Sequence, residues 1–229
     1  MNKQVSARPV FWQLVRKDWY LVAWPLVALL LAGLASIVVL SINHWMTFLV
    51  GSILLISVVV LIGVVLVFGS VVNERSQKTL ALVMSLPITA VQYTAAKLVS
   101  NVGVFTLAWL VLLGSTVVAI LTRDNLPDGL IPFAVIVLGQ LYVAYAITVA
   151  VALISESELW TIVVFSAFNI SISIFMNLMG RLSEIGSHME GPVPVWNATA
   201  LGIIAVEWLI VAGAVAVTLW VQSRKTDFL

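Results

Sequence analysis

The sequence predicts an all-α integral membrane protein that crosses the bilayer six times. Of its 229 residues, 62% are hydrophobic and 9% are charged, whereas about 25% of a typical soluble domain is charged. The apolar residues gather in six runs, each close to the roughly 20 residues that a helix needs to cross the hydrocarbon core. Helices are expected because lipid cannot satisfy free backbone groups, and the runs lack the alternation of barrel strands. We therefore expect a single transmembrane domain over residues 1–229.

The first element precedes the membrane. Within residues 1–20, helical spacing places Phe11 and Leu14 on one side and Arg16 and Lys17 on another. This pattern predicts either an N-terminal elbow helix lying in the headgroup plane or a simple cytosolic flank of the first span.

Six spans and two notable loops follow. A coupling loop is expected at residues 73–92 and an outer loop at 180–199. Capping boxes at Thr89–Gln92 and Ser155–Glu158 mark two helix starts. The spans are expected at about residues 21–42, 48–72, 96–121, 130–154, 159–179 and 200–221.

The distribution of positive charge predicts the orientation. Nine of the 11 Lys and Arg residues fall on one side of the predicted spans, and only Arg123 and Arg181 fall on the other. The positive side is cytoplasmic, and an even number of spans places both termini there. We expect a multi-pass protein of the inner, cytoplasmic membrane. The nine residues are Lys3, Arg8, Arg16, Lys17, Arg75, Lys78, Lys97, Arg224 and Lys225.

Motifs for catalysis are not found in the sequence. It contains no G-x-x-x-x-G-K-[ST] loop, no H-E-x-x-H and no G-x-S-x-G. His188 lies near Glu184 and Glu190, but these residues lack the fixed spacing of metal ligands and indicate a solvated loop. A net charge of +1 without a basic stripe argues against nucleic acid. We expect no enzymatic activity and no cofactor bound by this chain.

A polar stripe runs along the fifth span. Its four residues are spaced by three, four and four positions, which places them on one helical face. They either line a pathway or subunit seam, or make hydrogen bonds between helices worth about 0.6 kcal/mol each. The stripe consists of Ser166, Asn169, Ser173 and Asn177.

Glu207 is an intramembrane carboxylate. It lies about seven residues into the sixth span, roughly 10 Å below the outer surface at 1.5 Å per residue. Because charge in lipid is costly, Glu207 is expected to face protein or water. It is either a functional group or a protonated or hydrogen-bonded group that serves helix packing.

The segment after the second span carries the most specific pattern. Helical spacing gives residues 77–86 an apolar face, Glu74 and Arg75 stand at its polar entry, and Pro87 ends it. An exposed apolar face on a cytoplasmic loop should be covered by the bilayer interface or by the groove of a partner. The residues expected to contact a partner are Glu74, Arg75, Lys78, Leu80, Val83, Met84 and Pro87.

The pairs Glu74-Arg75, Thr79-Leu80 and Lys97-Leu98, together with residues 82–88, resemble the cytoplasmic loop of ABC-2 type transporter permeases. Lys78 stands where that family often has glycine, and Ala96 replaces the glycine before Lys97. The resemblance implies a coupling helix that docks on a separate ABC ATPase subunit, which would bind ATP and Mg²⁺.

The resemblance to ABC-2 permeases also implies that two chains together form the substrate pathway of an exporter in membrane lipid. The second chain is another copy of this one or a related permease. The second and fifth spans would line the seam between them. A partner-independent secondary transporter is the alternative, although such proteins place charged or broken-helix sites near the midplane. The transported substrate is not indicated by the sequence.

Overall fold

The computed structural model describes residues 7–73 and 90–224, and these ranges contain helices and turns but no strand. Six helices are long and apolar enough to cross a membrane, which confirms the predicted number of spans. A π-helix, η1, directly continues the second of them. The elements are α1 (Ala7–Leu40), α2 (Trp45–Val67), η1 (Phe68–Val72), α5 (Ala90–Thr122), α6 (Leu130–Ser155), α7 (Glu158–Arg181), α8 (Ser183–Gly186) and α9 (Ala198–Arg224).

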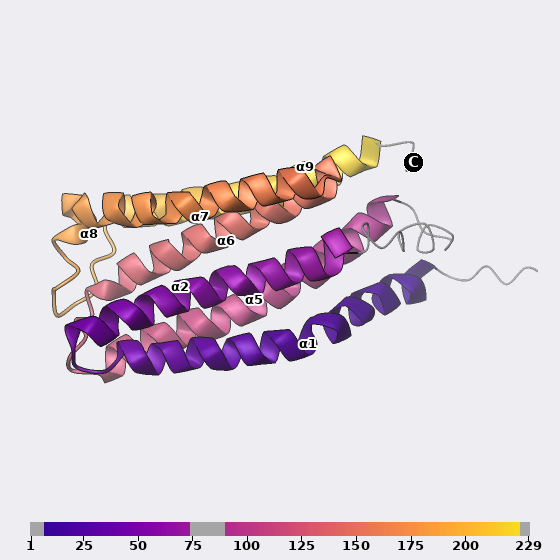
Figure 1. Ribbon diagram of the computed structural model, residues 1–229. Helices are drawn as coiled ribbons and strands as arrows, with labels where there is room; N and C mark the ends of the chain where they lie inside the picture. Colours follow the sequence, from indigo (N-terminus) through magenta and orange to yellow (C-terminus); the bar gives the residue numbers. More distant parts are fainter. Residues whose placement is uncertain (1–6, 74–89, 225–229) are drawn as a thin grey trace, which may run out of the picture.

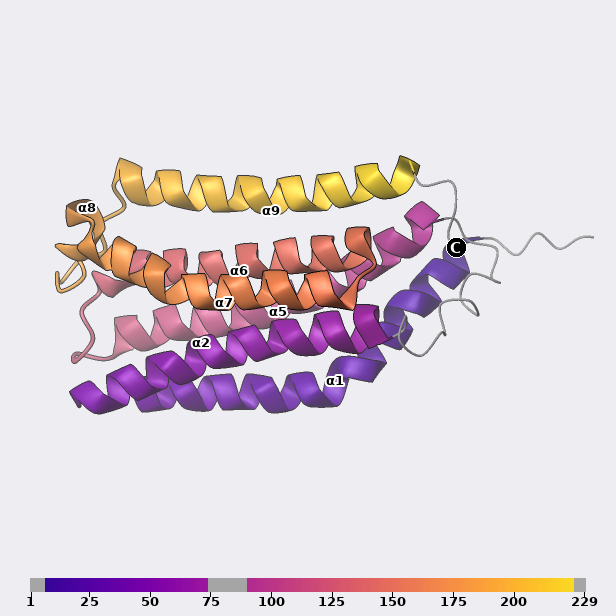
Figure 2. The ribbon, with the colours of Figure 1, turned by 45° about the horizontal axis from the view of Figure 1, so that its top comes forward.

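The long helices lie side by side as an elongated bundle (Figure 1). Helices α1, α2 and α5 form one side, and α6, α7 and α9 form the other, an arrangement that the turned view in Figure 2 preserves. The start of α1, the end of η1, the start of α5 and the end of α9 lie at one end of the bundle, and α8 lies at the other. We refer to these as the inner and outer ends, in accordance with the predicted orientation.

The hydrophobic core lies where α2, α5 and α6 meet. Ile62, Phe105, Leu112 and Val149 are each no more than 1% exposed. Helix α6 packs closely against α2, α5, α7 and α9, which makes it the central span. In contrast, α7 and α9 leave most of their apolar side chains exposed. Apolar side chains facing outward are expected where the surrounding solvent is lipid.

The N-terminal segment is continuous with the first span, and the elbow helix in the headgroup plane stays a prediction. Helix α1 runs unbroken through the predicted boundary at residue 20 and bends along its length (Figures 1 and 2). Pro25 lies inside α1, lacks a backbone donor and crowds the carbonyl group four residues earlier, which accounts for a bend. Leu14 and Val15 pack against Tyr93 and Ala96 of α5. Protein, rather than lipid headgroups, covers this part of the apolar face.

Two helix starts and the outer loop were also predicted. Helix α7 is capped by Ser157, whose hydroxyl group accepts a hydrogen bond from the Trp160 backbone at 3.4 Å. The expected cap, Ser155, is instead the last residue of α6. Thr89 of the other predicted box lies outside the described residues. The outer loop contains the short helix α8 and is joined to the preceding outer turn by a 2.9 Å hydrogen bond from Gly129 N to Gly191 O.

Candidate functional site: a buried ion pair and a tapering cleft

The predicted coupling residues are all in one stretch of sequence. Glu74, Arg75, Lys78, Leu80, Val83, Met84 and Pro87 lie outside the described residues. The two helices that flank this stretch are described, however. Element η1 ends directly before it, and α5 begins directly after it. A partner that acted on this stretch would therefore act first on η1 and α5.

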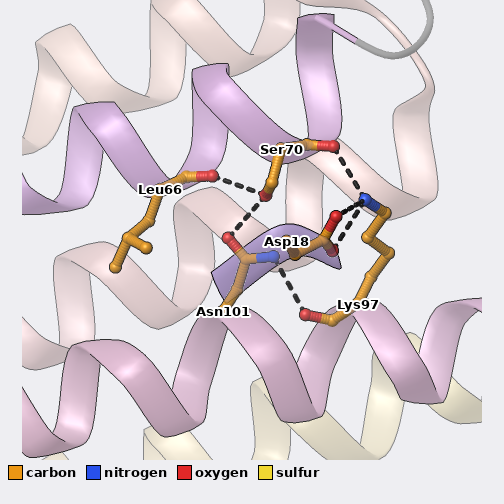
Figure 3. A network of polar contacts seen from close by, with 5 residues as sticks. All are labelled: Asp18, Leu66, Ser70, Lys97 and Asn101. Carbon is orange, nitrogen blue, oxygen red and sulfur yellow. Dashed lines mark hydrogen bonds and ion pairs between the residues drawn. The ribbon is translucent and has the colours of Figure 1, made fainter. Parts of the chain in front are cut away.

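An ion pair is buried at this end of the bundle. The Nζ atom of Lys97 on α5 lies 3.0 and 2.8 Å from the two carboxylate oxygens of Asp18 on α1 (Figure 3). Lys97 is 1% exposed and Asp18 is 3% exposed. The partners are 79 residues apart in the sequence. Removing one member of such a buried pair typically costs about 3–5 kcal/mol because the other charge is left uncompensated.

The same lysine also holds the end of the second span. Lys97 Nζ donates a hydrogen bond to the Ser70 backbone carbonyl oxygen, at 2.9 Å. Ser70 belongs to η1, and π-helical turns within α-helices are frequently found at functional sites. A single ammonium group thus ties α1, η1 and α5 together. It bridges the two elements that flank residues 74–89.

A second side chain supports this junction. Asn101 lies one turn after Lys97 on α5, and its amide nitrogen donates to the Lys97 carbonyl oxygen at 3.0 Å. Its Oδ1 atom lies 2.9 Å from the Ser70 hydroxyl oxygen, which also lies 2.6 Å from the Leu66 carbonyl oxygen (Figure 3). The one hydroxyl hydrogen can serve either acceptor. We call Asp18, Ser70, Lys97 and Asn101 the inner junction.

A cleft opens farther out, between α2 and α7. Helix α6 packs closely against both of them, whereas α2 and α7 share little backbone contact. The cleft has a volume of about 590 Å³ and is floored by α5 and α6. Its lining is mainly apolar, and within the described chain its polar members are Ser52, Ser57, Thr116, Ser173 and Asn177.

The cleft narrows toward the inner end. Along the same helices the next cavity measures only about 30 Å³, which is enough for a water molecule. It is lined by Gly63, Tyr145 and Asn169, among others. Beyond it, Phe68 of η1 meets Phe165 of α7 edge to face, with ring centroids 6.4 Å apart. The space between α2 and α7 therefore tapers inward and ends at an aromatic contact next to η1.

The polar stripe of the fifth span lies only partly on this cleft. Ser173 and Asn177 line the cleft, and Asn169 lines the small cavity below it. The Asn169 amide nitrogen donates to the Phe165 carbonyl oxygen of its own helix, at 2.9 Å. Ser166 is exposed and lines neither cavity. Among the described residues, the stripe makes no hydrogen bond to another helix.

Glu207 belongs neither to the inner junction nor to the lining of the cleft between α2 and α7. It is 5% exposed on α9, and its carboxylate packs directly on the backbone of Gly139 in α6. A Cβ atom added to Gly139 would lie 2.2 Å from Glu207 Oε2. Within the described residues, Glu207 has no ion-pair partner and its Oε1 atom has no hydrogen-bond partner. The carboxylate thus faces protein, one of the two surroundings expected from the sequence.

The inner junction was not predicted as a unit. The sequence marks Lys97 as a flanking charge and as part of a motif, and it does not single out Asp18, Ser70 or Asn101. One signal was available in the sequence. A lysine and an asparagine one helical turn apart stand at the start of an apolar run, where an unpaired charge is costly. The sequence does not indicate that the compensating acid comes from α1.

Comparison with known families gives one match. A model described as "ABC-2 family transporter protein" matches residues 13–219. No curated protein and no solved structure matches the chain.

Proposed function

The chain belongs to the ABC-2 transporter family, and we propose that it is the permease subunit of an ATP-driven exporter. It is a multi-pass membrane protein with six apolar spans. In this proposal two permease chains form the substrate pathway, and a separate ABC ATPase binds ATP and Mg²⁺. The second permease is another copy or a related chain. The complex resides in the inner, cytoplasmic membrane with both termini of this chain in the cytoplasm.

The inner junction is the observation that carries the proposal. A chain that has no nucleotide-binding motif can use ATP only if a rigid element transmits the motion of a partner. Lys97 connects η1 to α5 through its 2.9 Å bond to Ser70 and its ion pair with Asp18. The elements η1 and α5, which flank residues 74–89 in the sequence, are therefore joined to each other by a hydrogen bond and to α1 by an ion pair. A force on that loop would move η1 and α5 together.

The cleft supplies the other half of the mechanism. Helix α2 continues directly into η1, so a tilt of η1 changes the angle between α2 and α7. The two helices meet at Phe68 and Phe165 and enclose about 590 Å³ farther out. In the proposed cycle, ATP binding and hydrolysis in the partner alternately widen and narrow the space between α2 and α7. Substrate would move outward along the surface that contains Asn169, Ser173 and Asn177.

An ATP-driven cycle fits the site better than coupling to an ion gradient. Ion-coupled transporters place charged or broken-helix sites near the midplane. Among the described residues, neither membrane cavity between α2 and α7 is lined by a charged side chain. Glu207 packs against α6 and is not in either lining. The exposed α7 also leaves a face that a second permease can cover.

Variants of the coupling loop test the proposal. We expect Glu74→Lys or Val83→Asp to detach the ATPase or to uncouple ATP hydrolysis from transport, because Val83 lies on the predicted apolar face. The six spans should still insert, since neither change touches a span. Co-purification of the ATPase and the transport rate are measured for each variant. Val83→Ala and Glu158→Lys, a charge reversal in the first turn of α7, serve as matched controls.

Orientation is checked separately, by labelling in closed membranes. The chain contains no cysteine, so a single cysteine at Lys78 or His44 can be labelled with an impermeant maleimide. Position 78 should react only from the cytoplasmic side, on which the ATPase docks, and position 44 only from outside. Wild-type co-purification and transport in both loop variants, or labelling of position 78 from outside intact cells, would refute the proposal.

A further inference from the structure

The cleft between α2 and α7 continues into a second cavity at the outer end. This outer cavity measures about 480 Å³ and is formed by the three outer loops. The two cavities share part of their linings, so they adjoin each other, and we treat them together as one space. The shared residues are Leu40, Phe48, Leu126, Leu130 and Met189. From Phe48 to Ser57 along α2 the inner part extends about 13 Å at 1.5 Å per residue.

The inner part of this space is more apolar than its composition indicates. The hydroxyl group of Ser52 donates to the Phe48 carbonyl oxygen at 2.7 Å, and that of Ser57 donates to the Ile53 carbonyl oxygen at 2.8 Å. Thr116 likewise donates to the Leu112 carbonyl oxygen at 2.8 Å. These hydrogens are used within their own helices, so they are not free for a ligand. On the side formed by α2 and α5, a sugar or peptide backbone would therefore find no free hydroxyl hydrogen, whereas an alkyl chain needs none. Ser173 and Asn177 of α7 are the other polar members of the lining.

The outer part has the opposite character. Its lining includes Asn43, His44, Asn125 and Glu190, which lie in exposed turns. Glu190 carries the only charge among the lining residues. The three outer loops and the adjacent helix ends contain four carboxylate side chains and two arginines. The mouth therefore favours a positively charged or hydrogen-bond-donating group.

We propose that this space binds an amphiphile with a single alkyl chain and a cationic headgroup. The chain lies between α2 and α7 down to the level of Ser57 and Ser173. The headgroup lies at the mouth beside Glu190. This assignment rests on the proposed export function and adds the substrate class to it.

The headgroup provides the selectivity. An alkyl chain that enters the cleft from the bilayer exchanges one apolar surrounding for another, so the hydrophobic effect contributes little. The head, in contrast, exchanges the headgroup region for a mouth with a net excess of carboxylates. An exposed ion pair of this kind corresponds to a preference of about two- to fivefold for a cationic over a neutral head. An anionic head of equal chain length should bind more weakly still.

Photo-crosslinking on the isolated permease tests this assignment without the ATPase. The chain is placed in phosphatidylcholine nanodiscs with a dodecyl probe that has a diazirine at its terminal carbon. Three heads are compared, namely trimethylammonium, maltoside and sulfate. We expect the cationic probe to label α2 between residues 48 and 57 and α7 between 172 and 177. Competition with the unlabelled amphiphile gives the affinity and its dependence on the head.

Two pairs of variants sharpen the test. Ser173→Trp should fill the cleft and abolish the labelling, whereas Ile174→Trp, on the same helix but outside the lining and 60% exposed, should preserve it. Glu190→Gln should remove the preference for the cationic head. Glu184→Gln should retain it, because Glu184 accepts a hydrogen bond from Thr199 and does not line the mouth.

Three outcomes would overturn the assignment. Labelling spread evenly over the lipid-facing helices would show that bilayer lipid fills the cleft without selection. Equal or stronger binding of the sulfate probe would contradict the role of Glu190. A disulfide between cysteines at Ile53 and Ser173 of two neighbouring chains, together with loss of labelling, would show that a second copy occupies the cleft. Because binding is measured without the ATPase, these results are independent of the coupling-loop variants.

Discussion

The two ends of the α2–α7 region are built in opposite ways. At the inner end, Lys97 and Asp18 form a buried ion pair, and Phe68 closes against Phe165. At the outer end the same two spans separate around about 590 Å³ of mainly apolar space. The two spans are thus held together at the inner end and separated at the outer end. In the export cycle proposed above, a small displacement at the fixed end would produce a larger one at the open end.

Two buried carboxylates show the same contrast between regions. The charge of Asp18 on α1 is compensated by Lys97 on α5. The Lys97 ammonium group also donates a hydrogen bond to the Ser70 carbonyl oxygen of η1. Glu207 has an unpartnered Oε1 atom among the described residues and is accommodated because Gly139 has no side chain. Burial of the Asp18 carboxylate depends on an opposite charge, and burial of the Glu207 carboxylate depends on the absence of a side chain at Gly139. Substitutions can separate these two kinds of dependence.

The largest effect is expected at the inner junction. Lys97→Met removes the ammonium group that pairs with the buried Asp18 carboxylate and donates to Ser70, which should cost about 3–5 kcal/mol of stability. Thermal unfolding in detergent measures the loss. The double variant Lys97→Met with Asp18→Asn removes both charges and should recover at least half of it. A single variant as stable as the wild type would show that the pair is not structurally required.

A smaller effect is expected where Glu207 meets Gly139. In Gly139→Ala the added methyl group would lie 2.2 Å from Glu207 Oε2, so the carboxylate at the end of the Glu207 side chain must shift, at a cost of about 1 kcal/mol. Glu207→Gln keeps the shape and should give near-normal assembly with at most a modest loss of activity. A double-mutant cycle of Gly139→Ala with Glu207→Ala measures the coupling. Additive costs would indicate that the close contact does not determine the fit.

The smallest effect on stability is expected at the open cleft, with a clear effect on transport. Asn169→Leu with Asn177→Leu keeps α7 apolar and helical, and neither amide bonds to another described helix, so stability should change by less than about 0.5 kcal/mol. Transport and substrate-stimulated ATP hydrolysis should fall. Ser166→Leu, on the same stripe but outside both cavities, is the control. If the double variant transports like the wild type, the stripe does not belong to the pathway.

The sequence predicted the spans because their cause is local. A helix in lipid must satisfy its own backbone, so each apolar run defines its own span, and all six were found. Most of the observed helices extend beyond the predicted spans by up to six residues at one end, and α1 begins 14 residues before its predicted span, at Ala7 instead of residue 21. Amphipathic turns can continue a helix past the hydrocarbon core. Helix α1 shows this most clearly, because its amphipathic start is held by Tyr93 and Ala96 of α5. The coupling residues from Glu74 to Pro87 stay a prediction.

Tertiary structure alone decided which polar groups meet. The pairing of Asp18 with Lys97 joins residues 79 positions apart, and no periodicity within either helix specifies it. The same holds for Glu207 on Gly139, and for the division of the stripe between cleft, small cavity and outer surface. Sequence determines which face of a helix is apolar or polar, because that depends on the 3.6-residue period. Which neighbour that face contacts depends on how six helices share one core, and only the packed bundle determines it.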